Sequence, residues 1–330
     1  MLATDFLTMA TRISNGWALF KPLYWIFGQC MKGLLFVLND QYFLALVIFT
    51  ILTRLVLFPL NISQQKKTAK SSRLQPKIQK IQKKYANTKD PRDRQKMNEE
   101  MQALYQREGH NPMNMGCGPM AFQMVFLMGV IGIIYYPIQY IIGITNLDQS
   151  ATQIAEALNL DGAYFQIGLL QGFEGYKETL ATQFGDLFTA DKIEAIENYR
   201  RHMFLFGIDM TQIPHWKDGV IVVIPILAFI TSMLSSVVST LIQKKTNPAM
   251  AQQSSQMMIM MLMMPLFSFY IAFKVSAAVG FYWIISNLVA VVQQLVTAKF
   301  FPPKYNIARE MIENTIKRRA REESIKKIKD

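Results

Sequence analysis

The chain has 330 residues, of which 51% are hydrophobic and 18% charged, and it carries a formal net charge of +12. Soluble domains usually have a larger charged fraction, and here the charges are confined to a few polar blocks between long apolar ones. The composition therefore predicts an all-α polytopic membrane protein and argues against a series of soluble domains. Two cysteines and three histidines are too few for a disulfide framework or a multi-ligand metal site.

The N-terminal region, residues 1–41, is predicted to lie at the outer face of the membrane. The chain opens with MLATDF, without a basic region ahead of an apolar core, so no cleavable signal peptide is expected. An apolar stretch at 17–38 is interrupted by two lysines, a proline and a glutamine, and it contains Trp17, Tyr24 and Trp25. Because tryptophan and tyrosine favour the membrane–water interface, we predict a helix lying on the surface, with a sixth span as the alternative.

Five segments are apolar and long enough to cross a bilayer, which takes about 20 residues per helix. These predicted spans are residues 42–61, 118–144, 219–242, 257–273 and 279–298. The polar segments that follow them are residues 62–117, 145–218, 243–256 and 299–330. We name residues 145–218 the outer segment.

The distribution of Lys and Arg predicts the orientation of these spans. Residues 63–112 contain 13 basic and 5 acidic residues, and the tail 299–330 contains 10 basic and 5 acidic residues. Residues 145–217 contain 5 basic and 10 acidic residues. Because cytoplasmic loops carry the excess of Lys and Arg, five spans place the N-terminus outside and the C-terminus in the cytoplasm. Cys30 and Cys117 then lie on opposite faces and cannot form a disulfide within one chain.

Residues 62–117 are predicted to form a basic helical hairpin on the cytoplasmic side. Pro76 is expected to kink or restart its first helix, and Asp90 to cap a second helix that begins at Pro91. Basic residues recur at steps of three and four along the first helix, at Lys66, Lys70, Arg73, Lys77, Lys80 and Lys84. Apolar strips with similar spacing run along both helices, at Leu74, Ile78, Ile81 and Tyr85 and at Met97, Met101, Leu104 and Tyr105.

The basic stripe of this hairpin has two interpretations. It is either a solvated face whose charge sets the topology, or a docking surface for anionic lipid or for an incoming chain. No aromatic residue alternates with the basic positions, so a specific nucleic-acid site is not expected.

Arg54 is a cation within an otherwise apolar span, in the run FTILTRLVLFPLN at 49–61. An arginine at a helix centre costs roughly 2.5–3.5 kcal/mol to insert. No acidic residue lies in any predicted span, but other spans contain polar residues, among them Gln123, Ser286, Asn287 and Gln293. Arg54 therefore either snorkels to the inner interface or faces a hydrated pocket open to the cytoplasm. The polar content of the other spans favours the pocket.

The predicted fourth span opens with QMMIMMLMMP at 256–265, which includes Met257, Met258 and Met261. Methionine is flexible and polarizable, and it suits surfaces that accept many apolar shapes. The run is either such an adaptable surface or ordinary lipid-facing side chains.

Three motifs occur in order along the predicted spans: TRLVLFPLNISQQKK at 53–67, NPMNMGCGPMAFQMVF at 111–126 and VGFYWIISNLVAVVQQLVTAKFF at 279–301. Together with the five-span topology they resemble the YidC/Oxa/Alb membrane protein insertases of Gram-positive type. The likeness extends over about 42–144 and 219–301. The outer segment is longer than in minimal members of that family, and the lipoprotein signal of Gram-positive members is absent.

The resemblance implies five transmembrane helices around a hydrophilic groove open to the cytoplasm, with a cytoplasmic helical hairpin, in the plasma membrane of a bacterium. It implies a protein with no enzymatic activity, metal or cofactor, which inserts nascent membrane proteins and helps them fold. The predicted groove residues are Arg54, Gln123, Trp283, Ser286, Asn287 and Gln293. The predicted apolar surface along which a substrate leaves comprises Met257, Met258, Met261, Phe281 and Tyr282. Anionic lipids, the ribosome through the basic tail, and the Sec translocase are further candidate partners.

The outer segment is expected to contain short helices, around 151–158 and 190–204, and no motif in it indicates chemistry. Two other functions are compatible with the composition. A secondary transporter that binds a small anion at Arg54 requires inverted repeats, which the sequence does not show. A membrane tether for ribosomes depends on the tail, so truncation after Pro303 separates it from an insertase.

Overall fold

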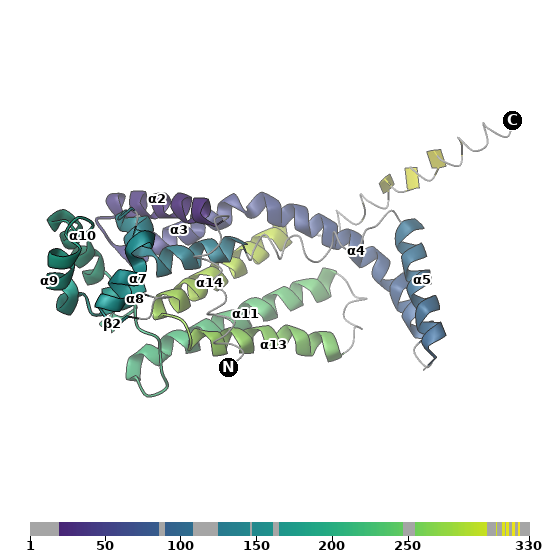
Figure 1. Cartoon of the computed structure of the whole chain (residues 1–330). Coiled ribbons are helices and arrows are strands. Elements are labelled where there is room, and N and C mark those ends of the chain that lie inside the picture. Colours follow the sequence, from purple (N-terminus) through teal and green to yellow (C-terminus); the bar gives the residue numbers. More distant parts are fainter. Residues whose placement is uncertain are drawn as a thin grey trace. The chain divides into compact units, whose positions relative to one another are not determined.

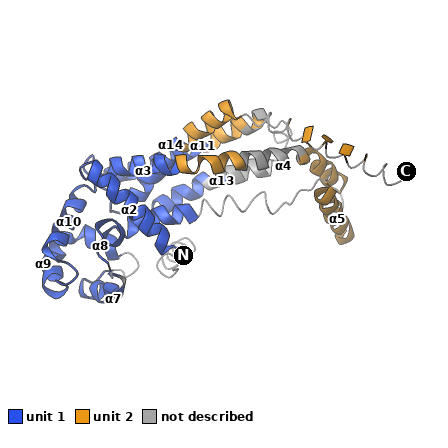
Figure 2. Ribbon diagram, turned by 90° about the horizontal axis from the view of Figure 1, so that it is seen from above, with its two compact units in different colours: residues 1–54, 123–235, 261–289 blue, residues 55–122, 236–260, 290–330 orange. Residues whose placement is uncertain are grey.

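The computed structural model describes residues 20–85, 90–107, 125–145, 147–160, 165–246 and 255–301, with scattered residues between 308 and 323. Helices account for most of these residues (Figure 1), as the composition predicts. They form two compact units (Figure 2). The first unit comprises residues 1–54, 123–235 and 261–289, and the second comprises residues 55–122, 236–260 and 290–330.

The first unit holds the apolar core and the outer segment. Its apolar helices are α2 (Lys21–Val37), α3 (Tyr42–Val56), the helix Val125–Tyr135 with the π-helical turn η1 (Ile138–Ile142), and most of α13 (Ser255–Ala272). The first parts of α11 (Val223–Thr246), which follows the 3-10 turn η2 (Gly219–Val222), and of α14 (Ala277–Phe300) also belong to it. The outer segment contributes α7 (Leu147–Ala157), α8 (Phe165–Gln171), α9 (Phe173–Gln183), α10 (Ala190–Arg201), β1 (Phe204–Leu205) and β2 (Ile208–Asp209).

Two of the helices in the described residues, Gly219–Ile242 and Ala277–Phe300, are long and apolar enough to cross a membrane by length and composition. They coincide with two predicted spans, 219–242 and 279–298. Shorter apolar helices, Tyr42–Val56 and Val125–Tyr135, lie within two further predicted spans, and α13 (Ser255–Ala272) covers most of the remaining one. The structure thus agrees with an all-α membrane protein.

Prolines divide the first two predicted spans into shorter helical pieces. α3 ends at Val56, and α4 (Phe58–Lys84) begins after a one-residue turn, with Pro59 in its first helical turn. A proline is tolerated at that position because the first N–H groups of a helix have no partner within the helix. In the second span the α-helix ends at Tyr135, and Pro137 precedes η1. The sequence does not predict either interruption of the helix, because the apolar residues continue through both.

One face of α3 lies in the core and the opposite face is exposed. The buried face includes Phe43 and Phe49, whose rings contact Phe281 and Phe27 with centroid distances of 5.3 Å in each pair. Leu44, Ile51 and Leu52 on the opposite side are exposed apolar residues. An exposed apolar helix face beside a packed one is the pattern expected of a helix that contacts lipid.

α2 packs closely against the end of the second predicted span at Gly28. The absence of a side chain at Gly28 allows this close approach. A Cβ at Gly28 would lie 2.3 Å from the carbonyl oxygen of Tyr140, whereas a Cβ at Gly33 on the same helix would have nothing within 4 Å. Within the predicted helix at 17–38, the structure shows a helix at Lys21–Val37 with one buried face. Its location at the membrane surface stays a prediction.

Gly28→Ala is expected to lower the stability of the protein by roughly 1–3 kcal/mol, because an overpacked site must shift its backbone or side chains. Gly33→Ala is the matched control, and we expect it to be neutral or to stabilise the helix by up to about 1 kcal/mol. Thermal unfolding of the purified protein in detergent measures both. Equal effects of the two substitutions would contradict the close contact between α2 and Tyr140.

The second unit contains the predicted basic hairpin, formed by α4 and α5 (Pro91–Arg107). Leu74, Ile78 and Leu104 are buried together, and Ile81, Met101 and Tyr105 pack against them. The two apolar strips therefore meet as their spacing predicts. The cap is confirmed as well, since the backbone N–H of Arg92 donates to Asp90 Oδ1 at 2.9 Å. Of the two alternatives expected at Pro76, the restart is wrong, because α4 runs through this proline, with buried Leu74 and Ile78 on either side packed against α5. A kink at Pro76 stays a prediction.

In the outer segment, α7 and α10 lie where short helices were predicted, and Figure 1 shows them grouped with α8 and α9 at one end of the first unit. α10 ends at Arg201 rather than continuing to residue 204. The chain then forms the two-stranded antiparallel hairpin β1–β2, in which Phe204 pairs with Asp209 and Leu205 with Ile208. The apolar residues of this hairpin do not reveal it, because strands of two residues are too short to show alternation.

Candidate functional site

Arg54 lies in the last turn of α3 and reaches across to α14. Its Nη2 donates a hydrogen bond to Ser286 Oγ at 2.6 Å and makes a longer contact of 3.4 Å with the carbonyl oxygen of Ser286. Taken as a whole residue, Arg54 is half-buried. Tyr282, one helical turn before Ser286 on α14, is buried.

A second polar pair lies at the adjacent residue of α14. Asn287 Nδ2 contacts Thr231 Oγ1 of α11 at 3.4 Å, and Thr231 Oγ1 itself donates to the carbonyl of Leu227 at 2.8 Å. Polar groups from α3, α14 and α11 thus lie at neighbouring positions along α14, as the polar content of the predicted spans indicates.

The two groups that Arg54 contacts, the hydroxyl and the carbonyl of Ser286, are both neutral. Within the part of the chain that the structure describes, Arg54 forms no ion pair with a carboxylate. A guanidinium has five N–H donors and stays protonated, so its bonds to Ser286 leave donor groups over. Arg54 can therefore bind a further anionic group without giving up an existing ion pair.

The other predicted groove residues are distributed as follows. Trp283 is half-buried and packs against the apolar core. Gln293 is half-buried in the part of α14 that belongs to the second unit, and its carbonyl accepts a hydrogen bond from Thr297 Oγ1 at 2.6 Å. Gln123 lies outside the described residues.

The predicted apolar exit surface is only partly visible. Met257, Met258 and Met261 belong to α13, but the structure does not describe their side chains. Phe281 is partly buried against Phe43, and Tyr282 is buried. These two aromatic residues therefore form packing within the first unit rather than an exposed surface. Further along α13, Met263, Leu266, Phe267 and Tyr270 are exposed.

The predicted docking stripe on α4 is partly engaged within the hairpin. Lys77, Lys80 and Lys84 have exposed side chains, and Lys84 forms a hydrogen-bonded ion pair with Glu100 of α5. The side chains of Lys66, Lys70 and Arg73 lie outside the description.

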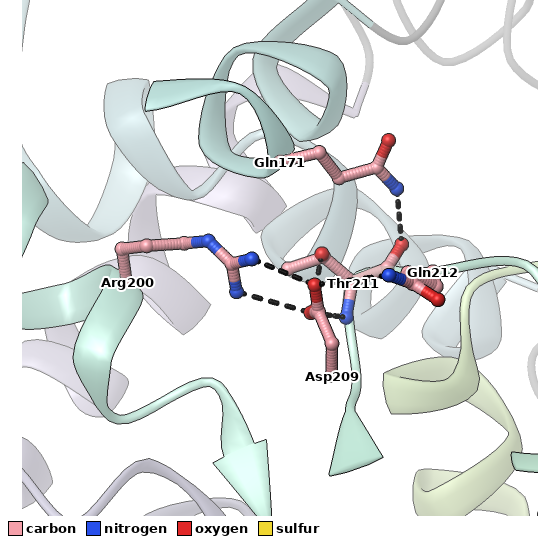
Figure 3. Close-up of polar contacts among 5 residues, drawn as sticks. All are labelled: Gln171, Arg200, Asp209, Thr211 and Gln212. Atoms are coloured by element: carbon pink, nitrogen blue, oxygen red, sulfur yellow. Dashed lines mark hydrogen bonds and ion pairs between the residues drawn. The ribbon is translucent and has the colours of Figure 1, made fainter. Parts of the chain in front are cut away.

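A polar cluster that the sequence does not reveal joins α8, α10 and the end of β2 in the outer segment (Figure 3). The guanidinium of Arg200 donates two hydrogen bonds to Asp209, Nη1 to Oδ1 at 3.0 Å and Nη2 to Oδ2 at 2.6 Å. Thr211 donates to the same carboxylate from its N–H at 3.0 Å and from Oγ1 at 2.7 Å. Gln171 of α8 donates to the carbonyl of Thr211 at 2.8 Å. We name these four residues the outer clamp.

The outer clamp positions two carbonyl groups over the N-terminus of α14. The N–H of Ala277 donates to the carbonyl of Gln212 at 2.8 Å, and the N–H of Ala278 donates to that of Met210 at 2.8 Å. The first N–H groups of a helix have no partner within the helix, so these bonds satisfy them. The outer segment thereby holds the helix that carries Trp283 and Ser286. A local sequence pattern cannot predict these hydrogen bonds, because the residues that they join are far apart in the sequence.

The Asp209 carboxylate makes the stability of the outer clamp dependent on pH. Burial alone would raise the pKa of Asp209, but the hydrogen bonds from Arg200 and Thr211 hold it below its ordinary value of 3.8. A lowered native pKa means that the carboxylate form is the one stabilised by folding. This contribution is fully present above pH 3.8 and is lost as the pH falls through the lowered native pKa.

Hydrogen exchange of the Ala277 and Ala278 amides is expected to stay slow at pH values above 3.8 and to accelerate below it, once intrinsic exchange is corrected for. Asp209→Asn is the matched control, and its exchange should lack this acid transition. An identical transition in Asp209→Asn would assign the pH dependence to another group.

Comparisons with known proteins cover most of the chain. The model of a family described as 60Kd inner membrane protein matches residues 34–304. Membrane protein insertase YidC 1 of Listeria monocytogenes is 26% identical over 286 residues, which are 86% of this chain and 74% of that protein. Membrane protein insertase YidC of Oceanobacillus iheyensis is 44% identical over 88 residues, 27% of this chain and 34% of that protein. Membrane protein insertase MisCB of Bacillus subtilis is 34% identical over 117 residues, 34% and 41% of the two chains.

Proposed function

The chain belongs to the 60Kd inner membrane protein family, the YidC/Oxa/Alb membrane protein insertases, and we propose that Arg54 is its binding site for acidic segments of substrates. The protein inserts newly made proteins into the bacterial cell membrane, the activity for which its relatives are named. The observation that carries the proposal is the half-buried state of Arg54, which is bonded to neutral Ser286 and has no carboxylate partner among the described residues.

The proposed architecture is five transmembrane helices around a hydrophilic groove that opens to the cytoplasm. The polar pairs Arg54–Ser286 and Asn287–Thr231 support it, because they line up polar groups from three helices whose opposite faces are apolar and exposed. Polar groups inside a membrane protein usually face the bundle interior or a water-filled cavity. In this architecture the N-terminus and the outer segment lie outside, and the α4–α5 hairpin and the C-terminal tail lie in the cytoplasm.

The proposed mechanism begins with electrostatic attraction. A carboxylate of the substrate pairs with Arg54 in a groove whose dielectric constant is lower than that of bulk water, so the attraction is stronger than at an exposed surface. Ser286 and Asn287 supply neutral hydrogen-bonding groups next to Arg54, and Gln123 is a further proposed contact. The polar segment of the substrate thus leaves the cytoplasm without meeting hydrocarbon directly.

The apolar segment of the substrate then moves into lipid. Trp283 and the methionine-rich start of α13, with Met257, Met258 and Met261, are the proposed contacts at this stage. Methionine side chains adapt to many apolar shapes, and the indole ring offers a large apolar face. Transfer of the substrate helix into hydrocarbon provides the free energy for the step. No bond is hydrolysed in this mechanism.

The cytoplasmic hairpin and the tail are proposed to act before the groove does. The exposed Lys77 and Lys80 of α4 suit contact with anionic lipid headgroups, each contributing on the order of 1 kcal/mol near such a surface. The tail, with 10 basic residues, is the proposed contact for the ribosome, and the Sec translocase is a further proposed partner.

Photo-crosslinking from position 283 to a ribosome-stalled membrane protein tests the proposed path. We expect adducts when the acidic segment and the first apolar residues of the substrate have left the ribosome. A crosslinker at the exposed Leu288 of the same helix is the control, and it should react mainly with lipid. Equal substrate adducts from both positions, or none from 283, would contradict the path along Trp283.

A further inference from the structure

The hairpin β1–β2 places an aromatic residue where its local geometry disfavours one. Phe206 and Gly207 form the two-residue turn, and their φ angles are 52° and 78°. Turns with positive φ at both central residues normally have Asn, Asp or Gly at the first position, because a bulky side chain is strained there. Phe206 is nevertheless present, and its side chain is 94% exposed.

This turn lies beside the beginnings of two candidate membrane helices. β2 contacts η2, the first turn of the apolar helix Gly219–Ile242. The residues directly after β2 accept hydrogen bonds from Ala277 and Ala278, the start of the apolar helix Ala277–Phe300. The hairpin is therefore held at the level where both helices begin, which corresponds to the outer membrane–water interface in the proposed orientation.

The neighbouring loop presents further apolar side chains at this level. Trp216 is 68% exposed although its ring stacks on Phe273 at the end of α13, with a centroid distance of 4.4 Å. Val220 in η2 is also exposed, and so is Phe204 in β1. Aromatic side chains at both ends of a transmembrane bundle typically lie among lipid headgroups.

The charge of the hairpin fits lipid better than water. Its sequence, FLFGID at 204–209, contains a single charged residue, Asp209, and the bidentate bonds from Arg200 neutralise that carboxylate. The guanidinium of Arg200 also lies 4.7 Å from the centre of the Phe204 ring. The hairpin thus presents an apolar tip with no unpaired charge, although it belongs to an acidic segment.

We propose that the β1–β2 hairpin is a lipid anchor, which inserts Phe206 into the outer interface of the membrane, where the exposed Trp216 also lies. The anchor holds the carbonyls of Met210 and Gln212 over the first turn of α14, and it thereby fixes the depth of the helix that carries Trp283. The inference goes beyond the proposed insertase mechanism and depends only on the proposed orientation of the spans.

Depth-dependent fluorescence quenching of the full-length protein in phosphatidylglycerol–phosphatidylcholine nanodiscs tests the anchor. Phe206→Cys is labelled with an environment-sensitive fluorophore in a variant that also carries Cys30→Ser and Cys117→Ser. Lipids with a nitroxide near the headgroup are expected to quench position 206 at least threefold more than Asp186→Cys, an exposed position elsewhere in the outer segment. Aqueous iodide should show the opposite order.

Leu288→Cys serves as the control for orientation, because this exposed residue lies within Ala277–Phe300. Quenching of position 288 by deep nitroxide lipids without quenching at 206 would overturn the anchor and leave the insertase proposal intact. Absence of quenching at 288 would overturn the proposed spans and, with them, the anchor that depends on their orientation. Protection of position 206 from both lipid and aqueous quenchers would also overturn the anchor, since it would show a protein partner over the turn.

Phe204→Cys provides a second measurement that leaves the turn residues unchanged. We expect its quenching by shallow nitroxide lipids to be intermediate between that of positions 206 and 186. If slow exchange of the Ala277 and Ala278 amides shows that the hairpin is formed and position 204 still behaves like position 186, the anchor is excluded.

Discussion

Arg54→Ala is expected to slow the insertion of dependent membrane proteins by roughly tenfold to a hundredfold, whereas Arg54→Lys keeps most of the activity. A hydrogen bond between charged partners contributes about 1.5–3 kcal/mol, and each 1.4 kcal/mol corresponds to about a tenfold change. Lysine retains the positive charge and loses only the forked geometry. Insertion of a single-span substrate with an acidic translocated segment into proteoliposomes measures the effect.

Two controls separate the charge of Arg54 from its structural contact. Ser286→Ala removes the hydroxyl that Arg54 binds at 2.6 Å but leaves the cation, so it should reduce insertion far less than Arg54→Ala does. A substrate whose acidic residues are replaced by asparagine and glutamine should respond weakly to both variants. Normal insertion of the acidic substrate by Arg54→Ala at native abundance would refute the electrostatic role.

Arg200→Ala is expected to lower the free energy of unfolding of the outer segment by about 3–5 kcal/mol, because it leaves the Asp209 carboxylate buried without its cation. The side chains of this pair are only 14% and 12% exposed. Loss of the ion pair frees the turn whose carbonyls accept hydrogen bonds from Ala277 and Ala278. Hydrogen exchange at these two amides should therefore accelerate, and so should proteolysis near residue 209.

Arg201→Ala is the matched control for this prediction. Arg201 is adjacent in sequence, but its pair with Glu197 is 3.7 Å long and exposed. Exposed ion pairs contribute roughly 0–1 kcal/mol, so the unfolding temperature should change little. Thermal unfolding in nanodiscs compares the two variants. Similar destabilisation by both would mean that the outer clamp does not hold the outer segment in place.

The elements that the sequence predicts well are those specified by residues close together in the chain. A continuous apolar run locates the helix Gly219–Ile242. Spacing of three and four residues locates the strip of Leu74 and Ile78, and its partner strip on α5. The cap at Asp90 follows from the proline after it. In each case the information lies within one or two helical turns.

The features that the sequence does not reveal depend on distant partners or on short breaks. Arg54 is recognisable as an unusual residue, but its contact with Ser286 joins positions 232 residues apart. The hydrogen bonds from Ala277 and Ala278 to the outer segment also join residues that are far apart in the sequence. At Pro76 the local sequence is misleading. Proline tends to end a helix, but the packing of its neighbours Leu74 and Ile78 against α5 keeps α4 continuous.

Access of water to position 54 is the most direct measure of the proposed groove. Arg54→Cys, in a variant with Cys30→Ser and Cys117→Ser, is treated with a charged thiol reagent that does not cross membranes. We predict labelling in inverted vesicles and none in right-side-out vesicles, while Leu52→Cys on the exposed apolar face of α3 reacts in neither. If position 54 is as unreactive as position 52 from the cytoplasmic side, the hydrated binding site for substrates does not exist.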